Sequence, residues 1–364
     1  MATTIATSAS HQRNVALDVL RGMTICFMII VNTPGNSATT FSPLDHAKWF
    51  GFTPTDLVFP SFLFAVGNAM SFVMNKWEKM PQVEVVWKIL KRTALIFFLG
   101  YLMYWFPFFR LVKDHHIIGE PISETRIMGL WQRIALCYGI AALMIYYFKI
   151  RASVIICVAI LFLYWIILYS FGDPTDPLSM QGNAGFALDK WLMGERHMYH
   201  GEGVAFDPEG WLSTWPAIGN VVGGYVVGKW VQHKGSSYEV VTKLLMAGFG
   251  LLVCGYFWDL LFPISKKLWT SSFVVYTVGL DCIILAVLMY IIQIKDKVKW
   301  TGFFQVFGKN PLFIYLLSEL GVTILFMIPA GNSNLFRWIF QTIFIHPGGY
   351  FGSLLFAVSY MLFC

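Results

Sequence analysis

Apolar stretches of about 20 residues recur along this chain, and they limit its fold more than any other feature. A helix needs about 20 apolar residues to cross the hydrocarbon core of a bilayer. In the whole sequence 57% of residues are hydrophobic and 13% are charged, which is about half the charged fraction of a soluble domain. The runs lack the two-residue alternation of barrel strands. The sequence therefore predicts an all-α, polytopic membrane protein.

Ten membrane-spanning helices fit these runs. Residues 1–14 are polar and are predicted to be disordered, and residues 15–364 are predicted to form a single transmembrane domain. The run at 335–345 is too short to span and is predicted to be an interfacial helix. The ten predicted spans are 15–33, 55–75, 87–106, 128–148, 152–171, 211–230, 241–262, 270–293, 303–328 and 347–364.

Basic residues fall mainly in one set of connections between the spans, and the positive-inside rule orients the chain from this difference. The basic set is predicted to be cytoplasmic, which places both termini in the cytoplasm and makes residues 172–210 an extracytoplasmic loop. The net charge of +6 is thus explained by topology and not by nucleic-acid binding. The cytoplasmic set is Arg13, Arg21, Lys76, Lys79, Lys88, Lys91, Arg92, Lys149, Arg151, Lys229, Lys234, Lys243, Lys295, Lys297, Lys299 and Lys309.

Four ionisable side chains lie inside predicted spans: Asp56, Arg133, Asp281 and Glu319. Charged groups are costly in lipid and usually face a cavity or a partner. Asp56 and Arg133 lie at similar predicted depths near the outer face, so we expect them to pair, directly or through a shared ligand. Such a pair is either structural or catalytic, since buried ionic networks serve both purposes.

The sequence predicts neither a disulfide framework nor a metal site. All six cysteines lie within apolar runs, where no oxidising compartment can pair them. His197 and His200 form a His-x-x-His pair, but zinc requires a third and a fourth ligand that the sequence does not fix.

The segment DHAKWFGFTPTDLVFP, residues 45–60, places several polar groups at the outer mouth of the second predicted span. His46 lies there beside Asp45 and Lys48. A histidine can be a general base near neutral pH, and a neighbouring carboxylate can set its tautomer. A loop histidine is more often ordinary surface, so position alone does not assign it a role.

Six motifs together resemble the heparan-α-glucosaminide N-acetyltransferase family. In order, they are RNVALDVLRGMTICFMIIVNTPG, HAKWFGFTPTDLVFPSFLFAVG, GLWQRIALCYGI, FDPEGWLSTWPAIGNVVGGYVVG, LWTSSFVVYTVG and GKNPLFIYLLSEL. They extend from residue 13 to about residue 320 in the order of the family. The chain lacks the animal-type luminal N-terminal domain and first span, so it resembles a bacterial member. A bacterial inner membrane is therefore expected, and the natural acceptor is left open.

The resemblance implies an acyltransferase that takes acetyl-CoA from the cytosolic side and acetylates the amine of a terminal glucosamine, as in heparan sulfate, on the far side. It places the catalytic histidine at His46, a loop asparagine at Asn32 and a buried aspartate at Asp56. His46 would then be the base, and the Asn32 amide would donate to the developing oxyanion. Relay through an acetylated His46 is the alternative to direct transfer, and we favour direct transfer.

The two substrates suggest further residues. The phosphates of CoA call for cations on the cytoplasmic face, although such cations also serve as positive-inside anchors. Carboxylates can bind an amino sugar and Trp can stack on it, although loop solvation and interfacial anchoring explain the same residues. The cofactor-binding candidates are Arg13, Arg21, Arg92, Arg133 and Asn310, and the substrate-binding candidates are Asp45, Asp207, Glu209 and Trp211.

The predicted partners are acetyl-CoA, an amino-sugar or glycosaminoglycan-fragment acceptor and the lipid bilayer, with no nucleic acid and no metal. The sequence leaves open whether the protein is a homodimer. The main alternative function is an amino-sugar transporter or permease, which would use the same intramembrane charges. Inverted repeats would favour a transporter, and none is evident in the sequence.

Overall fold

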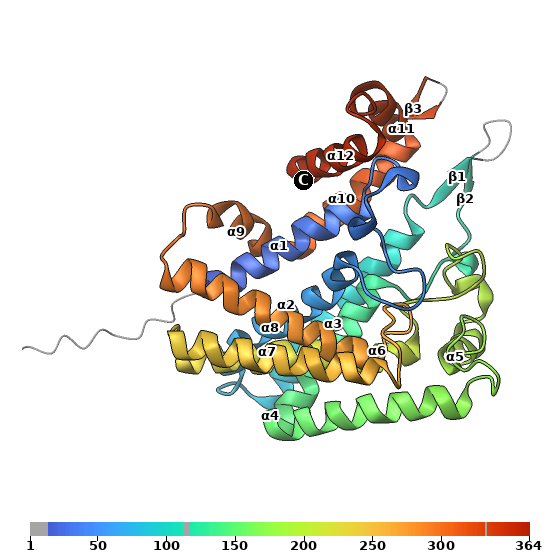
Figure 1. The fold of residues 1–364 in the computed structure, drawn as a ribbon. Helices are drawn as coiled ribbons and strands as arrows, with labels where there is room; N and C mark the ends of the chain where they lie inside the picture. Colours follow the sequence, from blue (N-terminus) through green and yellow to red (C-terminus); the bar gives the residue numbers. More distant parts are fainter. Residues whose placement is uncertain (1–13, 112–116, 332) are drawn as a thin grey trace, which may run out of the picture.

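The computed structural model describes residues 14–111, 117–331 and 333–364, and helices dominate these ranges (Figure 1). The long helices are α1 Val15–Asn32, α2 Pro54–Trp77, α3 Gln82–Trp105, α4 Leu130–Phe171, α6 Trp211–Lys234, α7 Tyr238–Asp259, α8 Ser271–Met289, α10 Pro311–Met327 and α12 Gly349–Phe363. Shorter helices are α5 Ala184–Met193, α9 Thr301–Lys309 and α11 Leu335–Ile339, with single turns η1 Ser37–Thr39, η2 Ser42–Leu44, η4 Ile122–Glu124, η5 Glu195–His197, η6 Tyr290–Ile294 and η7 Phe340–Phe344. Two small antiparallel hairpins pair β1 Phe109–Leu111 with β2 Ile117–Gly119, and β3 Pro329–Ala330 with β4 Ser333–Asn334.

Five of the described helices are long and apolar enough to cross a membrane: α1, α2, α4, α7 and α8 continued through η6. The bent pair α9–α10 makes a sixth when it is counted as one span. The protein is therefore a helical, multi-pass membrane protein. The predicted number of ten crossings and the predicted side of the termini stay predictions.

Two predicted spans differ in detail from the helices. The fourth and fifth spans are the two halves of α4, which is broken where Lys149 takes φ 60° and ψ 178°. Ser153 is buried there, and its hydroxyl donates to the carbonyl oxygens of Lys149 and Met144. The span predicted at 303–328 is two helices, α9 and α10, bent by 83°. The bend falls at Asn310 because the following Pro311 disfavours helical backbone in the residue before it.

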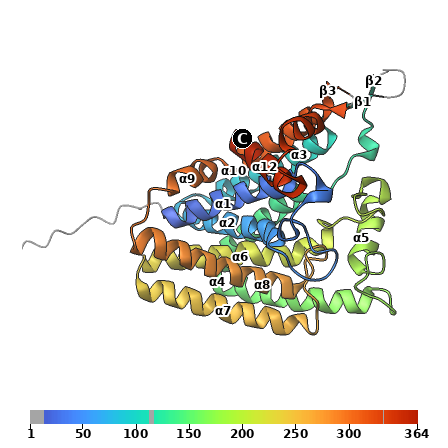
Figure 2. The same cartoon turned by 45° about the horizontal axis from the view of Figure 1, so that its top comes forward.

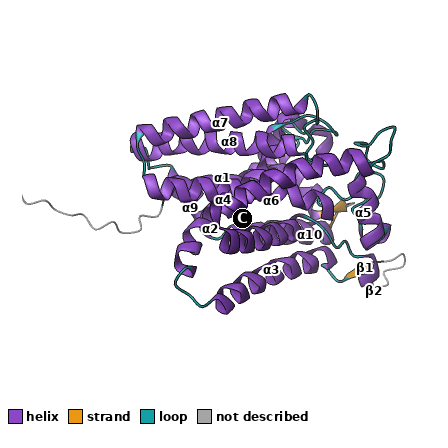
Figure 3. Cartoon of the chain, turned by 90° about the horizontal axis from the view of Figure 1, so that it is seen from below, coloured by secondary structure: helices purple, strands orange, loops and turns teal. Residues whose placement is uncertain are grey.

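Helix α2 lies inside the bundle, whereas α7 lies at its edge, opposite α3 (Figure 3). The most apolar window of α2 is 72% buried and that of α7 is only 28% buried. The exposed side chains of α7 are nevertheless apolar, among them Phe249, Tyr256 and Phe257. An apolar surface of this extent fits a lipid environment.

Glycines bring α2 and α6 into direct backbone contact. A Cβ atom on Gly67 of α2 would lie 1.9 Å from the carbonyl oxygen of Val221 on α6, and one on Gly224 would lie 1.9 Å from that of Phe64. Small residues allow such close packing between helices in a membrane. The contact fixes α2, whose first turn carries Asp56.

At the N-terminal end, Asn14 caps α1 by accepting a hydrogen bond from the backbone N–H of Leu17, and it also accepts from Gln293 Nε2. Of the segment predicted to be disordered, residues 1–14, only Asn14 is described, and Arg13 lies with the rest outside the described residues. Figure 2 shows α5 and the loops around it at the end of the bundle away from this terminus. The interfacial helix predicted at 335–345 corresponds to α11 and η7.

Candidate functional site

The carboxylate of Asp56 anchors the loop before α2. Its Oδ2 accepts hydrogen bonds from the backbone N–H groups of Ala47 at 3.2 Å and Thr53 at 3.0 Å, and from the Thr53 hydroxyl at 3.1 Å. Asp56 is 1% exposed. It is the third helical residue of α2, where a carboxylate satisfies free N–H groups of the helix start. Its other oxygen, Oδ1, is left to bind the ring of His46.

His46 Nδ1 lies 2.7 Å from Asp56 Oδ1. An ionised carboxylate only accepts hydrogen bonds, so the proton of the neutral imidazole lies on Nδ1 and the lone pair lies on Nε2. The side chain of His46 is 39% exposed, whereas that of Asp56 is 1% exposed. The pair therefore has the arrangement of a base held by a buried carboxylate, with the imidazole side chain partly exposed.

Lys266 places its ammonium group against the same imidazole ring. Its Nζ lies 3.0 Å from His46 Nε2 and 3.2 Å from Nδ1. Lys266 belongs to the α7–α8 connection, which is tied to the His46 loop because the Ser265 hydroxyl donates to the carbonyl oxygen of Trp49 at 2.7 Å. We name His46, Asp56 and Lys266 the His46 cluster.

A second charged group lies close to this cluster. Arg126 donates to both oxygens of Asp207, at 3.0 and 2.7 Å, and to Glu209 at 2.7 Å. Burial raises the pKa of the Glu209 carboxyl, but the cations Arg126, Arg133 and Lys266 lower it by more, so it lies below its ordinary value. The Arg126 guanidinium thus binds both carboxylates, and Arg133 and Lys266 add positive charge nearby. Asp207 has no exposed side-chain surface, so Glu209 is the more accessible of the two predicted substrate ligands.

The predicted direct pair of Asp56 and Arg133 is wrong. Asp56 instead binds His46 and the loop, while Arg133 donates to the carbonyl oxygen of Pro208 and the hydroxyl of Ser213 and lies 4.7 Å from the ring centre of Trp269. The pairing was predicted because the two residues lie at similar depths in their helices. The partner of Asp56 is instead His46, in the loop that precedes α2. Pairing through a shared ligand stays a prediction. Arg133 Nε and Nη1 have no hydrogen-bond partner among the described residues.

Asn32, the predicted oxyanion donor, is the last residue of α1 and belongs to a different group of polar side chains. Its Nδ2 donates to the Tyr315 hydroxyl at 3.1 Å, and both side chains interact with the Glu319 carboxyl of α10. No contact within the described residues joins Asn32 to His46. Its predicted role therefore depends on a substrate that reaches both residues.

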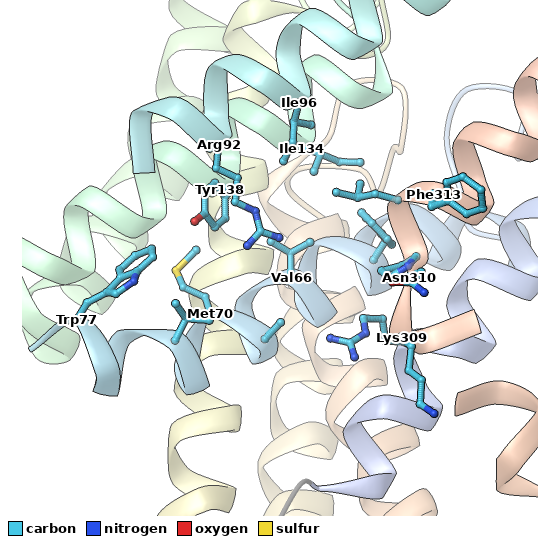
Figure 4. Close-up of a pocket in the computed structure, with 16 residues that line it drawn as sticks. Val66, Met70, Trp77, Arg92, Ile96, Ile134, Tyr138, Lys309, Asn310 and Phe313 are labelled. Atoms are coloured by element: carbon cyan, nitrogen blue, oxygen red, sulfur yellow. The ribbon is translucent and has the colours of Figure 1, made fainter. Parts of the chain in front are cut away.

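A pocket of about 390 Å³ opens between α1, α2, α3, α4 and the α9–α10 bend. Figure 4 shows Arg92 beside Tyr138 on one wall and Lys309 with Asn310 on the other. The Arg92 guanidinium carbon lies 4.9 Å from the centre of the Tyr138 ring. Arg21 also lines the pocket and donates to the Gly308 carbonyl oxygen and to Asp18 Oδ1, both at 2.6 Å. We name this cavity the Arg21 pocket.

The Arg21 pocket gathers three of the five predicted cofactor residues, Arg21, Arg92 and Asn310. Of the other two, Arg133 does not line it and Arg13 is outside the described residues. Helix α2 connects the pocket with the His46 cluster. It lines the pocket from Phe62 to Trp77, and Phe62 is six residues from Asp56, a rise of about 9 Å along a helix.

The remaining predicted substrate residues, Asp45 and Trp211, have fewer contacts that connect them with the His46 cluster. Asp45 is exposed, and its Oδ1 accepts from the backbone N–H of His46 at 2.9 Å. Trp211 starts α6, and its backbone N–H donates to Asp189 Oδ1 at 2.9 Å. No described contact joins Trp211 to the His46 cluster.

Lys266 and Arg126 were not predicted as site residues from the sequence. Lys266 stands two residues before the motif LWTSSFVVYTVG, and Arg126 stands shortly before GLWQRIALCYGI. Their proximity to motifs was the available signal. Both residues lie in connections between spans, where a charged side chain is not costly and so does not by itself indicate a site.

The chain is similar to two curated proteins, both named heparan-alpha-glucosaminide N-acetyltransferase. It is 27% identical to the Mus musculus protein and 26% identical to the Homo sapiens protein, in each case over 86% of this chain and 54% of the relative. The chain thus spans about half the length of these relatives. No protein-family model matches it. The two similarities confirm the resemblance carried by the six motifs: the chain is related to the heparan-alpha-glucosaminide N-acetyltransferases over most of its length.

Proposed function

We propose that this protein is a membrane-embedded N-acetyltransferase. It binds acetyl-CoA in the Arg21 pocket and transfers the acetyl group to the amine of a terminal glucosamine, or of a similar amino sugar, at the His46 cluster. The observation that carries the proposal is the hydrogen bond from His46 to Asp56 at one end of α2, while the same helix lines a cation-bearing pocket toward its other end.

The Arg21 pocket has the chemistry that CoA requires. Arg21, Arg92 and Lys309 supply positive charge for phosphate groups, which guanidinium and ammonium groups bind well. Val66, Met70 and other apolar side chains line the rest and suit an uncharged pantetheine arm. The volume of about 390 Å³ falls in the usual range for small-molecule sites.

The His46 cluster has the chemistry that acyl transfer to an amine requires. The Nε2 lone pair takes a proton from the attacking amine, the nitrogen–carbon bond forms and the carbon–sulfur bond of the thioester breaks. The proton then passes to the leaving thiolate. Asp56 holds the tautomer and stabilises the imidazolium that forms, as a buried carboxylate does in other acyl-transfer sites. Direct transfer is favoured over an acetylated His46, because an accessible base is sufficient for an amine nucleophile.

The same arrangement favours an enzyme over the transporter alternative. Both named relatives are acetyltransferases. A histidine held by a buried carboxylate is the arrangement of a catalytic base and not of a substrate path through a transporter. By the positive-inside rule the Arg21 pocket faces the cytoplasm and the His46 cluster faces the other side. We also propose that the chain crosses the membrane ten times, that both termini are cytoplasmic, and that the membrane is a bacterial inner membrane.

The test is an acetyl-transfer assay with purified protein, acetyl-CoA and glucosamine. His46→Ala should lose activity by about 10²-fold or more, the usual contribution of a general base, while it still binds acetyl-CoA. His200→Ala is the matched control, because His200 is an exposed histidine of the 172–210 loop. Full activity in His46→Ala would remove the proposed base, and no acetylation of any amino sugar by wild-type protein would remove the function.

A further inference from the structure

The ε-amine of Lys266 lies within proton-transfer distance of the His46 ring. A general base takes a proton from a group about 2.6–3.2 Å away, and Lys266 Nζ is 3.0 Å from the free nitrogen of His46. Its Nζ is also 3.2 Å from Nδ1, so the amine lies against the face of the imidazole and beside Nε2. The protein thus presents one of its own primary amines to its own base.

The surroundings of Lys266 favour its neutral, nucleophilic form. Burial lowers the pKa of the Lys266 ammonium, and the neighbouring cations Lys267 and Arg133 act in the same direction. Asp56 and Glu209 oppose this effect without reversing it. A lysine that is partly desolvated beside other cations is the usual form of an activated amine.

Lys267 differs from its neighbour although it has the same chemistry and the same loop. Its Nζ donates to Glu202 Oε2 at 2.5 Å, and the ion pair is largely buried, with 16% and 22% of the two side chains exposed. The Lys267 amine is thus held by a carboxylate and not beside the imidazole. The chain therefore contains a matched internal control one residue away.

From this geometry we infer that Lys266 is a self-acetylation site, whose ε-amine takes the acetyl group when a donor thioester is bound and no acceptor amine is present. The inference rests on the proposed function, which supplies acetyl-CoA as the donor. His46 Nε2 takes a proton from the ammonium of Lys266, the neutral amine attacks the thioester carbonyl, and the nitrogen–carbon bond replaces the carbon–sulfur bond. The proton on His46 passes to the leaving thiolate, which departs as CoA thiol, and the second proton lost by the nitrogen goes to solvent.

The experiment is incubation of purified full-length protein with isotope-labelled acetyl-CoA in the absence of acceptor, followed by peptide mass spectrometry. We expect about 10²-fold more label on Lys266 than on Lys267, since a positioned base contributes at least that factor. Glucosamine added at the start should reduce the label on Lys266, because the glucosamine amine competes with Lys266 for His46 Nε2 as the base. The label should survive hydroxylamine, which cleaves an acetyl-imidazole but not the amide of acetyl-lysine.

Two variants keep the assay interpretable, and the binding of acetyl-CoA is measured for each. His46→Ala should lose the label on Lys266 while it still binds acetyl-CoA. Lys266→Arg retains the charge and should reduce the label in that peptide to the low level on Lys267. Equal labelling of Lys266 and Lys267, or labelling that persists in His46→Ala, would show unassisted chemical acetylation and overturn the inference.

The same preparation is assayed with glucosamine, so the two failures can be told apart. Acetylation of glucosamine without any label on Lys266 would refute the self-acetylation site and leave the proposed function standing. If neither glucosamine nor Lys266 is acetylated by protein that binds acetyl-CoA, the proposed function and the inference both fail.

Discussion

The imidazole of His46 and the carboxylate of Asp56 form one unit, with 2.7 Å between Nδ1 and Oδ1. The other oxygen of Asp56 holds the loop that carries His46 through two backbone N–H groups. One buried carboxylate thus fixes both the tautomer of the ring and its place at the start of α2.

Replacement of Asp56 is predicted to remove catalysis more than folding. Asp56→Asn retains an acceptor but cannot stabilise the imidazolium, so kcat for acetyl transfer should fall by about 10²–10⁴-fold. Thr53→Ala is the matched control, since Thr53 donates to the same carboxylate at Oδ2 and not to the ring. It should lose about 1 kcal/mol of stability and retain kcat. Loss of kcat in both variants together would mean that Asp56 acts only by holding the loop.

Arg92 is predicted to contribute to the affinity for acetyl-CoA. It lines the Arg21 pocket, whereas its neighbour Lys91 does not. Arg92→Ala should raise the Kd by about 10-fold or more, because a hydrogen bond to a charged group contributes about 1.5–3 kcal/mol. Lys91→Ala should leave the Kd unchanged in a titration at the same ionic strength. Equal effects of the two variants would indicate general attraction at the membrane surface and not a built site.

Asp189 is predicted to make stability depend on pH. Burial raises the pKa of its carboxyl from 3.8 to about 7, although the backbone N–H of Trp211 donates to it. The folded protein therefore holds a proton that the unfolded chain releases near pH 4. The stability that this proton contributes is complete below about pH 4 and is lost as pH rises to about 7.

Asp189→Asn retains the acceptor for Trp211 and removes the charge. Its Tm in detergent should exceed that of wild-type protein at pH 8, and the two values should converge toward pH 5. Asp176→Asn, an exposed aspartate of the same loop, is the control and should follow wild type. A wild-type advantage at pH 8 would contradict the assignment.

The contact between α2 and α6 is predicted to tolerate no side chain. Gly67→Ala places Cβ 1.9 Å from the carbonyl oxygen of Val221, and Gly224→Ala places it 1.9 Å from that of Phe64. Each should cost about 1–3 kcal/mol through overpacking, seen as a lower Tm. Gly250→Ala on α7 has nothing within 4 Å of the new atom, so its Tm should be unchanged or slightly higher. A similar loss in all three variants would point to helix flexibility and not to packing.

The length of the apolar runs predicted those helices that coincide with a single uninterrupted run. The first predicted span, 15–33, nearly coincides with α1, and the second, 55–75, with α2. The break at Lys149 separates two predicted spans that the structure joins as α4. The bend at Asn310 was not predicted because 303–328 was assigned as one span, although Lys309, Asn310 and Pro311 interrupt the apolar run at that place.

The site was predictable where the motifs carry it and not where the packing of loops creates it. His46, Asp56, Arg21 and Arg92 were named from motifs and charge. The direct partner of Asp56 was misassigned to Arg133, since burial and depth along a helix do not say which side chain faces which. Lys266 was missed because its proximity to His46 depends on contact between two connections more than 200 residues apart in sequence.

Transfer across the membrane is the central claim, and sealed vesicles containing the purified protein test it most directly. Acetyl-CoA is supplied on one side only, and glucosamine on the same side or on the opposite side. The account predicts N-acetylglucosamine when the two substrates are separated by the membrane, and loss of that product in His46→Ala. Product that forms only when both substrates share a side would contradict the account, because the Arg21 pocket and the His46 cluster would then serve one compartment.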